Sequence, residues 1–474
     1  MLFASTVFLY LFLPITLFGY YVIFRKWRPA QNVFLLLASL FFYAWGEPKF
    51  VLVMILSIFC NWAFGLLVDK AKRAEKFKLQ KCFVTLACLF NLGLLFIFKY
   101  LNFSADVLNR VFGIGIEMQK IVLPIGISFF TFQALSYVID ISRGEGNVQK
   151  NILNVGLYIS FFPQLIAGPI VRYQTVADEI ANRKETWGGF YQGLIRFILG
   201  LAKKVLLANS FAYLADRAFD TVAEGAQISV LFSWLGVIGY ALQIYFDFGG
   251  YSDMAIGLGR MFGFHFLENF DHPYISHSIT EFWRRWHISL GTWFRDYLYI
   301  PLGGSRVKKS RLVLNLLIVW ALTGFWHGAN WTYLLWGLMY FVLLTFEKLT
   351  GFDRVTVRGI GWLKILYTLF FVLIGWAFFR ADNLNVAVRY LGMMFGTAAS
   401  AFADSMFWSY LGQNAVHLMI GILLSTPLLA SLFKKISKTV LTEILCAVGV
   451  LALFVLTVSV IVADSYNPFI YFNF

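Results

Sequence analysis

Apolar stretches that approach the length of a membrane span recur from one end of this chain to the other. A transmembrane helix needs roughly 20 predominantly apolar residues. Several of the stretches are short or interrupted, so we expect about ten to thirteen helices. Period-two alternation, the signature of membrane strands, is absent from the sequence, and the pattern predicts an all-α, polytopic integral membrane protein. The candidate stretches lie at 2–24, 33–45, 51–68, 83–101, 121–139, 152–166, 194–208, 230–246, 312–326, 331–346, 365–379, 416–432 and 444–462.

The composition excludes an ordinary water-soluble protein. Of the 474 residues, 59% are hydrophobic and only 14% are charged, and the mean hydropathy is +0.72. The net charge of +14 could indicate nucleic-acid binding. However, the basic residues lie in short loops between apolar stretches, where the positive-inside rule explains them. We therefore expect membrane lipids, and no nucleic acid, as partners.

Four clusters of basic residues predict the orientation of the chain. They lie at 25–28, 70–81, 306–311 and 434–438. Placing all four in the cytosol puts both the N-terminus and the C-terminal segment Asn467–Phe474 outside. Two apolar stretches separate the first two clusters, which fits this orientation. The sequence from 146 to 311 does not determine the path of the chain.

The chain shows no boundary between domains. No soluble domain, repeat or low-complexity tract separates from the rest, so we expect a single integral membrane domain, 1–474. Pro124, Pro163 and Pro169 interrupt apolar stretches, and broken helices are tolerated in a membrane only where protein or a water-filled cavity surrounds them. We therefore expect broken helices around a central tunnel. The four cysteines have no metal-ligand spacing, and we expect no metal and no bound cofactor.

Asp247 is a carboxylate inside an apolar run, in Tyr245-Phe-Asp-Phe-Gly-Gly-Tyr-Ser-Asp253. One interpretation is a buried carboxylate paired with a nearby arginine. The other is the wall of a substrate pocket, because the glycines would let backbone approach a ligand. Nothing in the sequence separates the two.

Aromatic and charged residues alternate through the segment 278–300, which predicts an amphipathic or interfacial helix. The spacing could place Arg284, His287 and Arg295 on one helix face, with Asp296 beside them, and Glu281 and Arg285 are a plausible i,i+4 pair. A charged face of this kind can anchor lipid headgroups or bind a substrate.

His327 follows the apolar run 312–326 between two glycines, with Asn330 three residues later. Imidazole is costly among lipid-facing hydrophobes, so His287 and His327 are functional candidates, although a histidine in an apolar run can also be a satisfied structural group. A general base must reach a hydroxyl or thiol and have a pKa near the working pH, which partial burial favours by opposing the imidazolium form.

Several motifs in chain order resemble the membrane-bound O-acyltransferase (MBOAT) family, in its bacterial branch of polysaccharide O-acetyltransferases. The two most distinctive are Phe282-Trp-Arg-Arg-Trp-His-Ile-Ser-Leu290 and Trp326-His-Gly-Ala-Asn-Trp331. The resemblance covers nearly the whole chain, and the further motifs lie at 123–132, 162–169, 200–205, 293–304 and 376–381. The resemblance implies the MBOAT fold, in which His327 matches the principal catalytic histidine and His287 matches a second site residue upstream.

The resemblance also implies a reaction and its participants. The donor would be a cytosolic acyl thioester, acetyl-CoA, and the final acceptor an exported polysaccharide such as alginate. A separate periplasmic or extracellular SGNH-type partner would complete the transfer. His327 is the candidate base and His287 the orienting group. Asn330, Arg284, Arg295, Asp296 and Asp247 are the candidate substrate-binding residues.

Other functions remain open on the sequence alone. One is D-alanyl transfer to teichoic acid, in which a carrier protein delivers the acyl group. Another is O-acetylation of peptidoglycan. A third is a polysaccharide or lipid transporter in which both histidines line a conduit, although paired inverted halves are not visible in the sequence.

Overall fold

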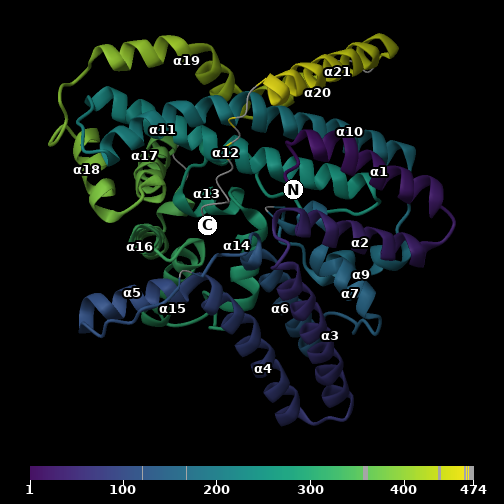
Figure 1. The fold of residues 1–474 in the computed structure, drawn as a ribbon. Helices are drawn as coiled ribbons and strands as arrows, with labels where there is room; N and C mark the ends of the chain where they lie inside the picture. Colours follow the sequence, from purple (N-terminus) through teal and green to yellow (C-terminus); the bar gives the residue numbers. More distant parts are fainter. Residues whose placement is uncertain are drawn as a thin grey trace. The chain divides into compact units, whose positions relative to one another are not determined.

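The computed structural model describes residues 1–119, 121–166, 168–355, 361–435 and 439–463, together with Tyr466 and Pro468. Helices form the regular structure of these residues, apart from an isolated bridge between Phe270 and Trp286 (Figure 1). The predicted all-α class is therefore confirmed. The C-terminal residues 467 and 469–474, and Lys438 of the last basic cluster, lie outside the described residues.

Eight helices in the described chain are long and apolar enough to cross a membrane, which confirms a polytopic membrane protein. The first apolar stretch forms a shorter helix, Phe8–Ile23. The expected number of about ten to thirteen includes stretches that the structure builds as short or interrupted helices. The eight helices are Val51–Arg73, Phe77–Phe112, Trp187–Ala223, Val230–Met261, Lys309–His327, Trp331–Thr350, Gly361–Arg380 and Val440–Ala463.

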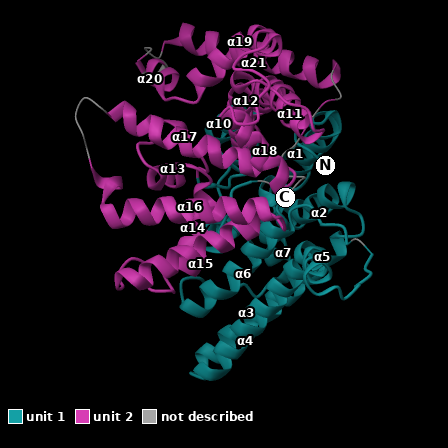
Figure 2. Ribbon diagram, turned by 90° about the vertical axis from the view of Figure 1, so that its left-hand side faces the viewer, with its two compact units in different colours: residues 1–197, 251–267 teal, residues 198–250, 268–474 magenta. Residues whose placement is uncertain are grey.

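Residue contacts divide the chain into two compact units (Figure 2). Unit 1 comprises residues 1–197 and 251–267, and unit 2 comprises residues 198–250 and 268–474. Helices α10 (Trp187–Ala202) and α12 (Val230–Met261) each run from one unit into the other. The expected single integral domain stays a prediction.

Proline sets several helix boundaries in unit 1. Helix α6 begins shortly after Pro124, and Pro163 lies in the first turn of α8, as the interrupted apolar stretches predict. Pro169 lies in the non-helical segment before α9. The helices of this unit are α1 (Leu13–Phe18), α2 (Arg28–Gly46), α3 (Val51–Arg73), α4 (Phe77–Leu95), α5 (Leu101–Phe112), α6 (Ile127–Arg143), α7 (Ile152–Ser160), α8 (Phe162–Leu165) and α9 (Tyr173–Asn182), with π-helical turns at Phe8–Phe12, Gly19–Ile23 and Phe96–Tyr100.

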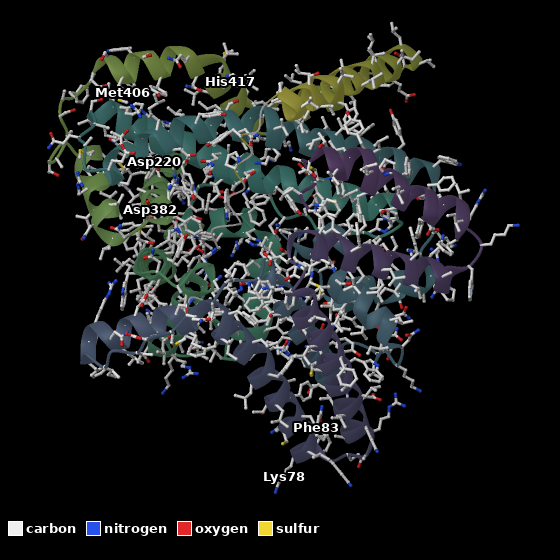
Figure 3. The ribbon with its side chains drawn as sticks, in the orientation of Figure 1. Lys78, Phe83, Asp220, Asp382, Met406 and His417 are labelled. Carbon is white, nitrogen blue, oxygen red and sulfur yellow. The ribbon has the colours of Figure 1, made fainter. Side chains whose placement is uncertain are left out.

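Helices α3 and α4 form a long hairpin in unit 1 (Figure 1). Asn61 and Asn91 join the two helices through reciprocal amide hydrogen bonds of 3.1 and 2.7 Å, which satisfies both buried side chains without water. Basic residues gather at the turn of the hairpin, where Figure 3 labels Lys78. The hairpin therefore joins an apolar stem to a cationic end.

Unit 2 carries the remaining helices. They are α11 (Asn209–Ala223), α13 (Ile279–Arg285), α14 (Ile288–Phe294), α15 (Lys309–His327), α16 (Trp331–Thr350), α17 (Gly361–Arg380), α18 (Leu384–Met394), α19 (Ser405–Leu424), α20 (Leu428–Lys435) and α21 (Val440–Ala463). Short turns connect some of them, with π-helical geometry at η4 (Lys203–Ala208) and η6 (Arg295–Tyr299) and 3₁₀ geometry at Pro273–Ile275 and Phe352–Arg354.

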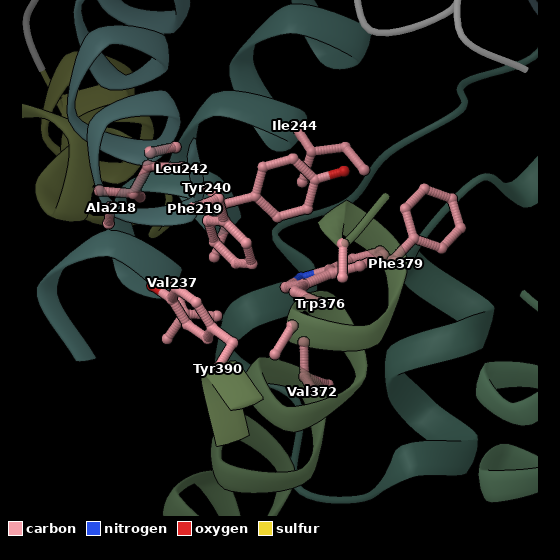
Figure 4. Close-up of a cluster of buried hydrophobic side chains, with 14 of the residues drawn as sticks. Ala218, Phe219, Val237, Tyr240, Leu242, Ile244, Val372, Trp376, Phe379 and Tyr390 are labelled. Atoms are coloured by element: carbon pink, nitrogen blue, oxygen red, sulfur yellow. The ribbon is translucent and has the colours of Figure 1, made fainter. Parts of the chain in front are cut away.

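Large aromatic side chains from α11, α12, α17 and α18 form the core of unit 2 (Figure 4). Phe219 of α11 stacks on Tyr390 of α18, with ring centroids 3.9 Å apart and planes only 5° from parallel. The Tyr390 hydroxyl donates a hydrogen bond of 2.8 Å to the Ser233 carbonyl of α12, so the core ring has a satisfied polar end. This core fixes α17, whose last turn carries Phe379 towards the candidate site.

Glycines allow α15 and α16 to approach closely. A Cβ at Gly324 of α15 would clash with the Tyr333 carbonyl of α16, and a Cβ at Gly337 of α16 would clash with the Trp320 carbonyl of α15. Small residues at such a crossing let two membrane helices touch through their backbones. This crossing places His327, the last residue of α15, against α16.

Candidate active site

A cavity of about 500 Å³ in unit 2 is lined by both candidate histidines. His287 and His327 are 3% and 7% exposed, so each imidazole is enclosed by protein. Arg284, Arg295 and Lys348 also line the cavity. The structure therefore brings together four of the sequence-predicted site residues, His287, His327, Arg284 and Arg295, and adds a lysine.

The predicted continuous helix over 278–300 is wrong, because the chain breaks at His287. Helix α13 ends at Arg285, Trp286 is extended, and His287 has a left-handed backbone with φ 47° before α14 begins. Backbone of the segment 269–271 replaces the missing helical hydrogen bonds: the Asp271 N–H donates to the Arg285 carbonyl at 2.9 Å, and the Ile288 N–H donates to the Asn269 carbonyl at 3.0 Å.

The break also corrects the predicted arrangement of side chains. Arg284, His287 and Arg295 do not share one helix face, although all three line the cavity. Arg284 lies on α13, His287 lies between α13 and α14, and Arg295 begins η6. The predicted i,i+4 ion pair is confirmed, with Arg285 Nη2 at 2.9 Å from Glu281 Oε1.

Asn269 fixes the proton position on His287. The amide Oδ1 of Asn269 accepts from the Ser289 N–H at 3.2 Å and the Ser289 hydroxyl at 2.9 Å, and it lies 3.1 Å from His287 Nδ1. Because this atom is an acceptor for Ser289, we assign the His287 proton to Nδ1 and the lone pair to Nε2. Burial lowers the pKa of His287 to about 3, so the imidazole is neutral at physiological pH.

Aromatic rings enclose His327. The rings of Trp326, Trp336 and Phe379 lie with their centroids 5.0, 5.1 and 5.1 Å from the imidazole, all at steep angles. Trp326 also contacts His287, with a centroid distance of 6.3 Å. One indole therefore touches both histidine rings.

Three cationic side chains, Arg284, Arg295 and Lys348, line the cavity, and two of them are paired with carboxylates. Arg295 pairs with Asp296 at 2.6 Å, and this hydrogen bond raises the pKa of the guanidinium above its usual value. Lys348 pairs with Asp353 at 2.8 Å. Arg284 is exposed and forms no ion pair among the residues that the structure describes, so its charge is available to an anionic ligand.

Two predicted site residues have structural partners instead of cavity contacts. Asn330 caps α16, because its side chain accepts from the Thr332 N–H at 3.2 Å and donates to the Asp382 carbonyl at 2.8 Å. Asp247 is a buried carboxylate, as one interpretation expected, but its partner is Lys204 at 2.9 Å and not an arginine. Asp296 does not line the cavity either, and it pairs with Arg295, which does.

Glu347 is a site-forming residue that the sequence analysis missed. Its buried carboxylate on α16 accepts from the Ile279 N–H at 2.7 Å, the Thr280 N–H at 2.8 Å and the Thr280 hydroxyl at 2.7 Å. It therefore holds the first turn of α13, one of whose residues, Thr280, lines the cavity. Glu347 directly follows the apolar stretch 331–346, where a charge at a helix end is ordinary, so its position gives little signal in the sequence.

Among the described residues, no group of three or more His, Cys, Asp or Glu side chains could hold a metal ion. The polar groups that line the cavity include imidazole, guanidinium and ammonium groups. Two enclosed histidines beside cations, inside a polytopic helical protein, define a class of membrane protein suited to group transfer by general acid–base catalysis.

Comparison with known proteins identifies the family. The model of MBOAT, the membrane-bound O-acyltransferase family, matches residues 142–388, which include both histidines. The chain belongs to the membrane-bound O-acyltransferase family and is a multi-pass membrane acyltransferase.

Curated relatives carry three kinds of acyltransferase name. The chain is 39% identical to the probable alginate O-acetylase AlgI of Pseudomonas putida over the whole of both chains. It is 34% identical to the peptidoglycan O-acetyltransferase of Helicobacter pylori, over 84% of this chain and 80% of that protein. It is 30% identical to the teichoic acid D-alanyltransferase of Bacillus subtilis, over 48% of this chain and 61% of that protein.

Proposed function

We propose that this protein moves an acetyl group from a cytosolic donor, acetyl-CoA, across the bacterial inner membrane for O-acetylation of an exported polysaccharide such as alginate. The observation that carries the proposal is the single cavity that both histidines line, next to Arg284, Arg295 and Lys348. The relative from Pseudomonas putida named as a probable alginate O-acetylase, which matches the chain along its whole length, supports this acceptor.

His327 is the proposed general base. It takes the proton of the acceptor hydroxyl as the hydroxyl oxygen bonds to the thioester carbonyl carbon, and the carbonyl electrons move to the oxygen. Collapse of this tetrahedral intermediate breaks the carbon–sulfur bond, and the imidazolium returns the proton to the departing thiolate. Arg284 and Arg295 line the cavity and are the candidate stabilisers of the oxyanion.

His287 is a poor base by comparison, because burial holds its pKa near 3. Its neutral ring still offers the lone pair of Nε2, since Asn269 binds Nδ1. The proposed role of His287 is to accept a hydrogen bond and so orient a substrate hydroxyl in the cavity.

The charge of the cavity supports a phosphorylated donor. Guanidinium and ammonium groups bind phosphate oxygens strongly, and acetyl-CoA carries several phosphates on the side away from its thioester. We propose that Lys348 binds these phosphates while the thioester reaches the histidines. In the proposed orientation, both termini lie on the outer side of the membrane, away from the cytosol. We also propose a central tunnel between the helices.

The relatives support an acceptor outside the membrane, so the acetyl group has to leave the site of the donor. We propose that a separate SGNH-type partner in the periplasm or extracellular space completes the transfer to the polysaccharide. Peptidoglycan is a second candidate acceptor, because the Helicobacter pylori relative carries that name over most of the chain. The Bacillus subtilis relative, which names D-alanyl transfer, matches about half of this chain.

The test compares the acetyl-ester content of exported glycans in cells that carry either the wild-type chain or His327→Ala at equal expression. We expect the ester to fall by more than tenfold while polymer yield persists, because removing a general base typically costs 10²–10⁴-fold. His417→Ala is the matched control, since His417 lies on α19 and does not line the cavity (Figure 3). Unchanged ester in the His327 variant would refute the catalytic role, and the glycan that loses ester identifies the acceptor.

A further inference from the structure

We propose that the buried ion pair between Lys204 and Asp247 is a positioning pair for His287, an inference that rests on the proposed function of the cavity. Lys204 Nζ lies 2.9 Å from Asp247 Oδ1, and the two side chains are only 3% and 2% exposed. Nζ also donates to Asn209 Oδ1 at 2.8 Å and to the Pro468 carbonyl oxygen. Neither residue lines the cavity.

A buried pair of this kind needs a reason. Removing two charges from water is expensive, and the attraction between them repays the cost only when the geometry is good and the other hydrogen-bonding sites are filled. An apolar pair would pack between these helices without that cost. The ion pair therefore supplies specificity: it selects one rotation of α12 against η4.

The backbones of α12 and η4 also touch beside the pair. A Cβ at Gly250 of α12 would lie 2.7 Å from the Gly200 carbonyl oxygen and 3.1 Å from the Lys204 nitrogen. This contact fixes the distance between the two helices, but a glycine surface does not by itself fix rotation. Asp247 lies less than one turn from Gly250 on α12. Its ion pair with Lys204 of η4 restricts the rotation of α12 about its own axis.

Phe248 links the rotation of α12 to the position of His287. It follows Asp247 directly, and its ring centroid lies 4.6 Å from the His287 imidazole at an interplanar angle of 86°. The same ring lies 4.8 Å from Phe270, the neighbour of Asn269, which binds His287 Nδ1. Because successive residues of a helix point about 100° apart, rotating Asp247 away from Lys204 moves Phe248 off the imidazole.

A second ion pair, which joins α12 to α10, the helix that precedes η4, provides a control. Arg196 of α10 lies 2.8 Å from Asp253 of α12, and both side chains are partly buried. This pair lies on the part of each helix that belongs to unit 1, whereas the surroundings of His287 belong to unit 2. Loss of Arg196 therefore tests whether any ion pair between these helices matters equally.

The first experiment measures kcat and KM for acetyl transfer by the purified full chain in lipid vesicles. We expect Lys204→Met to lower kcat by at least about tenfold with KM within about threefold, since a displaced catalytic group can cost 10²-fold. Lys204→Arg, which keeps the charge, should recover most of kcat, and Arg196→Met should stay within about threefold of wild type. Equal loss in Lys204→Met and Arg196→Met overturns the proposal.

Further variants separate positioning from folding. Lys204→Met/Asp247→Asn leaves no lone buried charge, so it folds even if the single variant does not. If the ion pair positions His287, the kcat of this double variant should stay low. If the pair only stabilises the fold, kcat should recover together with stability. The double variant Lys204→Met/Phe248→Leu should lower kcat little more than Phe248→Leu alone, because both substitutions act through the contact between Phe248 and His287. Fully additive losses contradict this route.

A readout that is independent of acyl transfer completes the test. Diethyl pyrocarbonate modifies accessible imidazoles, and peptide mass spectrometry gives the rate at each histidine. We expect Lys204→Met to raise the modification rate of His287 several-fold, because Phe248 no longer covers the ring, while exposed His265 is unchanged. An unchanged rate at His287 overturns the inference. This labelling requires no acetyl transfer, so its outcome at His287 is independent of the proposed function.

Discussion

At the scale of single residues, the two histidines have different chemical environments. His287 is held in one tautomer by Asn269, and burial keeps it neutral. His327 is held by aromatic rings at the end of a helix. This difference fits the proposed roles, in which His287 accepts a hydrogen bond and His327 takes the proton.

The depressed pKa of His287 predicts acid sensitivity. A group whose folded pKa is about 3 and whose usual value is 6.5 gives its full stabilisation above pH 6.5, and this is lost as the pH falls towards 3. We expect the unfolding free energy in detergent to fall by up to about 1.4 kcal/mol per pH unit over that window.

The control for this prediction is His287→Gln, which cannot titrate. The part of the acid slope that His287 contributes should vanish in this variant, as measured by thermal unfolding at a series of pH values from 7 to 4. If both proteins show the same slope, the histidine is hydrated in the folded state and its pKa is not depressed.

The sequence located the important side chains better than it located their partners. Both histidines stand in distinctive motifs, and Asp247 is visible as a charge in an apolar run. Asn269 carries no such signal, because it lies in a loop and meets His287 across 18 residues of chain. Lys204 could not be matched to Asp247 without the packing of η4 on α12.

At the scale of elements, hydropathy predicts the long helices well. Helical periodicity does not predict a helix break where backbone from a distant part of the chain supplies the hydrogen bonds. Helices α15, α16 and α17 coincide with predicted apolar stretches. The segment 278–300 has a helical pattern throughout, yet its helix breaks at His287 because residues 269–271 supply alternative hydrogen bonds. Local pattern cannot report a partner that arrives from another part of the chain.

Glu347 should be essential for the start of α13. Glu347→Ala leaves two buried N–H donors and a hydroxyl without their acceptor, and we expect a loss of roughly 2–4 kcal/mol in unfolding free energy together with reduced activity. Glu347→Gln keeps one acceptor and should lose less. Thermal unfolding of the detergent-solubilised variants measures both.

Phe346→Ala is the matched control, because this neighbour on α16 is 49% exposed. It should change stability by less than about 0.5 kcal/mol. Equal effects at the two positions would mean that the N-terminus of α13 does not depend on the carboxylate.

At the scale of the whole molecule, the distribution of charge predicts the orientation in the membrane. Lys49 and Lys78 flank α3, and the positive-inside rule places Lys78 in the cytosol and Lys49 outside. With the four native cysteines replaced by alanine, a membrane-impermeant maleimide added to spheroplasts should label Lys49→Cys and leave Lys78→Cys unlabelled until lysis. The reverse labelling would invert the proposed topology.

The family assignment and the helical class could be predicted from the sequence because both depend on motifs and hydropathy along the chain. The acceptor could not, because relatives named for alginate and for peptidoglycan both match over most of the chain. The motifs that identify the family do not name the sugar.

The crossing of α15 and α16 has a mechanical consequence. Where Gly324 and Gly337 let the two backbones touch, no layer of side chains lies between the helices that could rearrange. His327 ends α15 just beyond this contact, so its backbone is held in one position relative to α16. In a cycle that uses it as the base, the substrates travel to the imidazole and the imidazole stays where it is.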